Sequence, residues 1–67
     1  MKIILNGASR ELPDDSLTVR GLLTLLELGP QPVLVERNGA AVLSREFESE
    51  PVTDGDVIEI VRMVAGG

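Results

Sequence analysis

Cysteine, histidine, tryptophan and tyrosine are all absent from this chain of 67 residues. Without cysteine the chain has no disulfides, no Cys-ligated zinc or iron–sulfur cluster and no thiol catalysis. Without histidine it has no imidazole acid–base chemistry. One phenylalanine is the only aromatic residue, so the stacking platform of single-stranded nucleic-acid readers is also missing. These absences exclude most classes of enzyme before any motif is considered.

Positive charge is scarce as well, because six lysines and arginines stand against eleven aspartates and glutamates, for a net charge of -5. Nucleic-acid binding needs the opposite sign, since contacts to phosphates dominate its affinity. No apolar run approaches the roughly 20 residues of a membrane span, and the start of the chain does not read as a signal peptide. We therefore expect a cytoplasmic protein with neither a nucleic-acid nor a membrane partner.

The chain nevertheless has the composition of a folded protein, with 43% hydrophobic residues. A domain of this size buries only roughly 60% of the surface that its unfolded chain exposes, which leaves no room for an enclosed active site. We expect one domain over residues 1–64 and a flexible tail over residues 65–67.

Local patterns predict the element order β-β-α-β-β-β. Two Asn-Gly pairs, Asn6-Gly7 and Asn38-Gly39, are strong signals for hairpin turns. Apolar, β-favouring runs predict strands over residues 2–5, 33–37, 40–43 and 57–64, and the turn at Asn6-Gly7 predicts a returning strand over residues 8–12. Because one amphipathic helix can cover one face of one sheet, we expect an α+β fold with the helix across the sheet.

The helix is predicted over residues 19–28. Thr18 has the chemistry of an N-cap, and Gly29 is expected to end the helix at the C′ position. Apolar residues with a spacing of three and four mark the buried side: Val19, Leu22, Leu23 and Leu26.

Side-chain alternation assigns the two faces of the sheet. Glu59 must point to water, so its neighbours Ile58 and Ile60 face the helix. The same alternation leaves four apolar side chains on the face away from the helix: Ile4, Leu34, Val61 and Met63. This is a large exposed apolar surface for so small a domain.

Two acidic segments could form a metal site or a docking site. Asp54-Gly55-Asp56 lacks the ligand spacing of a calcium loop and is predicted to be a plain turn. Glu46, Glu48 and Glu50 form either a docking patch for a basic partner or a solvated loop.

The sequence ends in Gly66-Gly67 directly after the most apolar strand. One reading is a frayed end. The other is that the terminal carboxylate reacts, because two residues without Cβ can enter a narrow channel of another enzyme. A carboxylate is a poor acyl donor and must first be converted to a mixed anhydride with a nucleotide. A partner would have to supply ATP and magnesium, since this chain has no phosphate loop and is expected to bind no cofactor of its own.

Three segments resemble the ThiS family, the sulfur carriers of thiamine biosynthesis. They are Met1–Gly7, Val35–Gly39 and the run from Asp54 to Arg62 that leads to Ala65-Gly66-Gly67. The resemblance covers essentially the whole chain. It implies the ubiquitin-like β-grasp fold, with sheet order 2-1-5-3-4 and the first and last strands parallel at the centre.

The resemblance also implies a carrier cycle in which the chain is a substrate and not an enzyme. An E1-like enzyme of the ThiF type would adenylate Gly67, and a persulfide, drawn from cysteine by a donor such as a cysteine desulfurase, would convert it to a thiocarboxylate. Thiazole synthase of the ThiG type would take the sulfur. Ala65 and Gly66 would give the tail its reach, and Ile4, Leu34, Val61 and Met63 would bind the partner enzymes.

The chain departs from the family pattern at two positions. Leu43-Ser44 replaces a frequent Pro-Arg pair, which puts local loop contacts in doubt, and Phe47 replaces a frequent tryptophan. The small subunit of molybdopterin synthase (MoaD type) is the nearest alternative. Sulfur carriers of other pathways, a modifier attached to lysines, and a non-covalent interaction module that uses the outer sheet face also stay open.

Overall fold

The computed structural model describes residues 1–64. Nine elements follow in chain order: β1 (Lys2–Leu5), β2 (Ala8–Glu11), β3 (Leu17–Thr18), α1 (Val19–Leu25), β4 (Val33–Arg37), β5 (Ala40–Val42), the 3-10 helix η1 (Ser44–Glu46), β6 (Pro51–Val52) and β7 (Val57–Arg62). None of the helices formed by residues 1–64 has the length and apolarity needed to cross a membrane.

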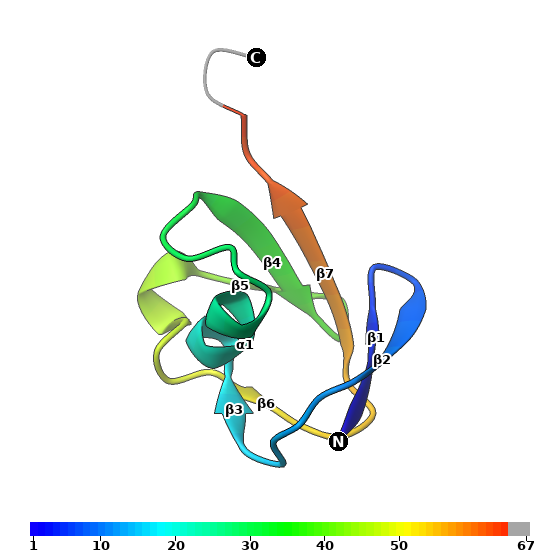
Figure 1. The fold of residues 1–67 in the computed structure, drawn as a ribbon. Coiled ribbons are helices and arrows are strands. Elements are labelled where there is room, and N and C mark those ends of the chain that lie inside the picture. Colours follow the sequence, from blue (N-terminus) through cyan, green and yellow to red (C-terminus); the bar gives the residue numbers. More distant parts are fainter. Residues whose placement is uncertain (65–67) are drawn as a thin grey trace.

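Five strands form one mixed sheet in the order β2-β1-β7-β4-β5. β7 lies at its centre, parallel to β1 and antiparallel to β4. Helix α1 lies against one face of this sheet (Figure 1). The α+β β-grasp class predicted above is confirmed, and the order of the five strands is the one that the family resemblance implies.

Both Asn-Gly pairs form the predicted hairpin turns. Asn6 and Gly7 have φ angles of 50° and 83°, and Asn38 and Gly39 have φ angles of 52° and 84°. Two successive positive φ angles define a type I′ turn, whose twist matches that of the flanking strands. The turns join β1 to β2 and β4 to β5, which pair antiparallel.

The helix begins as predicted and ends earlier than predicted. The Thr18 side chain accepts a hydrogen bond from the Gly21 amide at 3.1 Å, which caps the first turn. The last helical residue is Leu25, and Glu27, with φ 61°, occupies the C′ position that was expected for Gly29. Gly29 is left-handed as well, with φ 56°, but it lies two residues farther along the chain. The Glu27 and Leu28 amides donate to the carbonyls of Thr24 and Leu23, the bonds of a Schellman motif.

A second, two-stranded sheet was not predicted. β3 pairs antiparallel with β6, and Leu17 lies opposite Val52. Each strand has only two residues, and the partners are far apart in sequence, so no local pattern announces them. This small sheet lies beside α1 (Figure 1) and leads directly into its first turn.

The hydrophobic core lies between the five-stranded sheet and α1. Its buried residues come from every part of the described chain: Ile3, Leu12, Val19, Leu22, Leu23, Val33, Val35, Val42, Phe47, Val52, Ile58 and Ile60. The predicted inward orientation of Ile58 and Ile60 is confirmed, and Phe47 is buried as well. The sheet face away from the helix is left without a cover among these elements.

Candidate functional site

Strand β7 is held in place from both hairpins. The Asn6 side chain accepts from the Ile60 amide at 2.8 Å and donates to the Ile60 carbonyl at 3.2 Å. The Asn38 side chain accepts from the Val57 amide at 2.8 Å. Each turn asparagine therefore clamps the central strand as well as closing its own hairpin, and the strand that leads to the predicted reactive tail has a fixed position.

The predicted tail, Ala65, Gly66 and Gly67, lies outside the described residues. The chain reaches it through Met63 and Val64, which are both exposed. The Met63 amide donates to the Pro32 carbonyl at 3.0 Å, so backbone pairing with the segment before β4 continues one residue past the end of β7.

The face of the five-stranded sheet away from α1, called the outer face below, carries the predicted apolar side chains. Leu34 and Val61 lie directly opposite each other across β4 and β7. Ile4 is half-buried, whereas three of the four predicted side chains are well exposed: Leu34 59%, Val61 59% and Met63 46%. The structure therefore places the four on one face; what they bind stays a prediction.

Sequence reasoning missed two further apolar residues on this face. Val57 and Leu43 are each 46% exposed. Val57 is two residues from Glu59 on β7, so the alternation that placed Val61 outward could have placed Val57 there too. Leu43 follows β5, and finding it required the pairing of β5 with β4.

An open groove of about 270 Å³ lies at the β4–β5 side of the outer face. Its outward-facing walls are formed by Leu34, Glu36, Ala41, Leu43 and Met63. The groove is mainly apolar, with the carboxylate of Glu36 as its acidic group. Its shape and chemistry suit a protruding side chain of another protein better than a reacting small molecule.

Two glutamates lie opposite each other on this otherwise apolar outer face. Glu36 of β4 is the direct register partner of Glu59 of β7, and both are exposed. Side-chain alternation along β7 predicts that Glu59 points to water, as it does in the structure. The juxtaposition of the two glutamates depends on the β4–β7 register, which no local pattern reveals.

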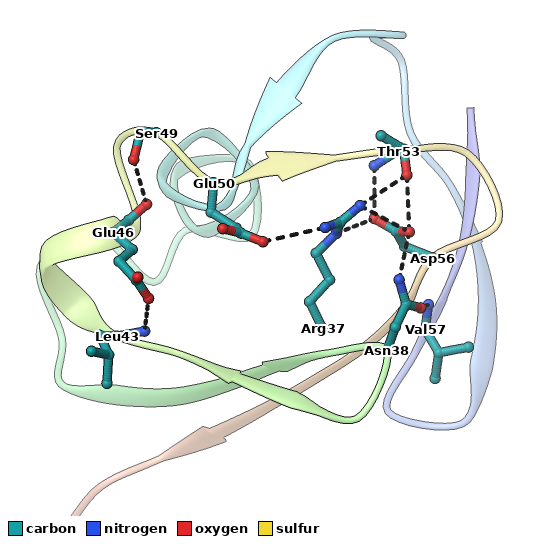
Figure 2. Close-up of polar contacts among 9 residues, drawn as sticks. All are labelled: Arg37, Asn38, Leu43, Glu46, Ser49, Glu50, Thr53, Asp56 and Val57. Carbon is teal, nitrogen blue, oxygen red and sulfur yellow. Dashed lines mark hydrogen bonds and ion pairs between the residues drawn. The ribbon is translucent and has the colours of Figure 1, made fainter.

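Asp56 directly precedes β7 and lies on the side of the sheet opposite to Glu36 and Glu59. It is only 5% exposed. It accepts hydrogen bonds from Arg37 Nε at 2.7 Å, from Asn38 Nδ2 at 2.9 Å, and from the amide and hydroxyl of Thr53 at 2.8 and 2.9 Å. Figure 2 shows the Arg37 guanidinium between the carboxylates of Asp56 and Glu50.

These bonds hold the pKa of the Asp56 carboxyl low. Burial alone would raise it, but the hydrogen bonds from Arg37, Thr53 and Asn38 outweigh burial and lower the pKa to about 2. The turn predicted at Asp54-Gly55-Asp56 is confirmed, but the prediction of a plain turn missed the buried ion pair. Within residues 1–64 no group of acidic side chains could hold a metal ion.

Each glutamate of the acidic run after β5 makes a contact within the chain. Glu46 accepts from the Leu43 amide at 2.9 Å, Glu48 pairs with Arg20 at 3.0 Å, and Glu50 pairs with Arg37 at 3.2 Å. Figure 2 shows the first and last of these contacts. The Glu46 contact lies within the loop itself, whereas Glu48 and Glu50 link the loop to Arg20 and Arg37. Binding of a basic partner by this run stays a prediction.

The model of the ThiS family matches residues 3–67. The chain is 39% identical to the thiazole synthase of Paramagnetospirillum magneticum and 37% identical to that of Magnetococcus marinus. Each match covers the whole chain but only 20% of the relative, so the chain spans a fifth of the length of these curated relatives.

Solved structures give the same result. The crystal structure of the thiamine biosynthesis protein (ThiS) from Geobacter metallireducens superposes with a TM-score of 0.86 at 32% identity, and the match covers all of both chains. The solution structure of a thiamine biosynthesis protein from the same organism gives a TM-score of 0.82 at 33% identity, covering all of this chain and 88% of the other.

Proposed function

The chain belongs to the ThiS family, and on this basis we propose that it carries sulfur for thiazole formation in thiamine biosynthesis, with the carboxylate of Gly67 as the reacting group. ThiS-family proteins are small sulfur carriers and not catalysts themselves, which supports the expectation of a carrier in place of an enzyme. The observation that carries the proposal is the family match, which extends through Gly66 and Gly67.

The proposed chemistry takes place on a carboxylate that this protein presents to other enzymes. An oxygen of the Gly67 carboxylate attacks the α-phosphate of ATP, and pyrophosphate leaves. A persulfide sulfur then attacks the acyl carbon, and AMP leaves. A thiol cleaves the resulting acyl disulfide, which releases the thiocarboxylate and an ordinary disulfide. ATP and magnesium belong to the activating partner in this scheme.

Three partners are implied. A ThiF-type enzyme forms the adenylate, a donor such as a cysteine desulfurase supplies the persulfide, and a ThiG-type thiazole synthase accepts the sulfur. The ThiG-type partner is supported by the two thiazole synthases that resemble this chain over a fifth of their length, since a segment like this chain forms part of those proteins. In this proposal Ala65 and Gly66 extend Gly67 into the partner's channel.

The outer face is proposed as the surface that meets these enzymes. Its exposed side chains Leu34, Val61 and Met63 lie on or next to the strand that leads to the tail, with Ile4 beside them on β1. A partner that docks there is close to the base of the tail, whereas α1 covers the other face. One partner enzyme can therefore bind the outer face and react with the tail at the same time.

The carrier proposal is tested by mass spectrometry of the intact chain. Incubation with the ThiF-type enzyme, magnesium-ATP, the sulfur donor and a thiol should add about 16 Da, the difference between sulfur and oxygen. The matched control is the same chain with Gly67 as a terminal amide, which should keep its circular-dichroism spectrum and gain no mass. Conversion of the amidated chain would contradict the proposal.

A non-covalent interaction module is the second candidate, because the exposed apolar outer face alone could serve it. Deleting Gly66 and Gly67 separates the two. The carrier loses ATP–pyrophosphate exchange with the activating enzyme, whereas an interaction module keeps its partner. Val61→Glu should weaken binding in both cases and so serves as the positive control.

A further inference from the structure

Glu36 and Glu59 form a like-charged pair that the domain does not neutralise. They are direct partners across β4 and β7, and both side chains are exposed. Among residues 1–64 neither carboxylate takes part in an ion pair or a side-chain hydrogen bond. Like charges directly opposite each other on a sheet are destabilising, so this arrangement is unfavourable in the isolated protein.

The surroundings of the pair are apolar. Along β7, Glu59 lies between Val57 and Val61, and along β4, Glu36 follows Leu34 by two residues on the same face. Glu36 also forms part of the groove wall together with Leu43 and Met63. Exposed apolar side chains therefore border the two carboxylates along both strands.

The basic residue nearest in sequence is directed elsewhere. Arg37 follows Glu36 on β4, but strand alternation turns it to the opposite side, where it pairs with Asp56 at 2.7 Å and with Glu50 at 3.2 Å. Most other glutamates of this half of the chain have partners, as the contacts of Glu46, Glu48 and Glu50 show. The Glu36–Glu59 pair thus has no basic partner among residues 1–64.

We propose that Glu36 and Glu59 together receive an arginine side chain of the activating enzyme, and that apolar side chains around this arginine pack on Leu34, Val61 and the groove. This inference rests on the proposed function, which supplies the partner. A guanidinium is planar, carries five donors and can serve two carboxylates at once. The surrounding apolar contact excludes water, which strengthens such a pair.

Two other occupants fit less well. A divalent cation prefers six or more oxygen ligands or a near-complete octahedron, and two carboxylates on a flat sheet give too few. A nucleic acid carries phosphates that these carboxylates repel. An arginine on an otherwise apolar protein surface satisfies both the charge and the bordering side chains.

The test measures non-covalent binding to the ThiF-type enzyme without ATP, for the wild type, Glu36→Gln, Glu59→Gln and the double variant. The matched control is Glu27→Gln, which removes the same charge at the helix end. The double variant should bind on the order of tenfold more weakly, with a shallower dependence on salt. The control should bind as the wild type does.

The same variants should change stability in the opposite direction. Removing one charge of the pair relieves repulsion, so Glu36→Gln and Glu59→Gln should raise the unfolding midpoint while they weaken binding. A merely structural role would lower both quantities together. An arginine-to-alanine change in the enzyme surface that contacts the pair should weaken wild-type binding but not binding of the double variant.

Each outcome decides the proposal. Equal binding of the double variant and the wild type, or an equal loss in Glu27→Gln, overturns it, as does wild-type binding that is insensitive to salt. Absence of any wild-type binding to the enzyme overturns it too. Because the assay needs no reaction at Gly67, a wild type that binds normally but never gains the thiocarboxylate mass refutes the carrier chemistry and leaves the arginine proposal supported or refuted on its own.

Discussion

Acidic groups lie on both sides of the β4–β7 pair. Asp56, which directly precedes β7, has partners within the chain, whereas Glu36 and Glu59 have none among residues 1–64. On the side toward α1, Asp56 is buried and accepts hydrogen bonds from Arg37, Asn38 and Thr53. On the outer face, Glu36 and Glu59 oppose each other. The inner acid stabilises the domain, because its own chain satisfies it. The outer pair costs stability and remains available to a partner.

The largest expected effect concerns the hydrophobic residues of the same strand. Ile58 is fully buried on the inner side, whereas Val61 is 59% exposed on the outer face. Ile58→Ala should lower the free energy of unfolding by about 2–5 kcal/mol through lost burial and a cavity. Val61→Ala should cost less than about 1 kcal/mol. Denaturant unfolding measures both, and similar losses would abolish the distinction between the two sides.

Asp56 gives the next largest effect and a dependence on pH. Its pKa is lowered to about 2 in the folded protein, so its stabilisation is present above the unfolded pKa of about 3.9 and is lost as the pH falls from about 5 to 2. The loss should reach about 2–3 kcal/mol. Asp56→Asn should be destabilised at pH 7 by about 3 kcal/mol.

The measurement is the free energy of unfolding of both proteins between pH 7 and pH 2. The curve of Asp56→Asn should be flatter than the wild-type curve, so the two should approach each other in acid. Glu27→Gln, at the end of the helix, is the control and should keep the wild-type slope. If Asp56→Asn lost as much free energy of unfolding in acid as the wild type does, other carboxyl groups would be the cause of that loss.

The smallest effect concerns the end of the helix that covers the inner side. Glu27 has a left-handed backbone with φ 61°, which costs a residue with a Cβ about 1–2 kcal/mol. Glu27→Gly should therefore raise stability by about 1 kcal/mol, or the midpoint of thermal unfolding by about 4–8 °C. Glu27→Ala removes the same charge without relieving the backbone and should give no such gain. An equal gain in both variants would assign the effect to charge.

Local signals predicted the parts of the fold that depend on neighbouring residues. The two Asn-Gly turns, the Thr18 cap and the faces of β7 follow from a few adjacent positions. The helix end was wrong because a Schellman motif formed around Glu27 two residues before the expected Gly29. The β3–β6 sheet was missed because Leu17 pairs with Val52 across 35 residues.

The candidate site was predictable to the same extent. Alternation placed Ile4, Leu34, Val61 and Met63 on the outer face. The same alternation places Asp56 on the side of Ile58, but its partner Arg37 can be identified only from the pairing of β4 with β7. The opposition of Glu36 and Glu59 can also be identified only from that register. The charge pairs on which the function proposals rest are therefore the features that sequence patterns predict least well.

The parallel pairing of β1 with β7 also governs when the molecule can form. Within this domain, β1 is made before its neighbour among residues 57–62, so the central ladder cannot close until that segment has left the ribosome. Until then β1 and its hairpin expose an unpaired edge, and contacts between such distant segments slow folding. The sheet of this domain therefore cannot form until residues 57–62 are available, and a chain cut short before residue 57 should not reach this fold.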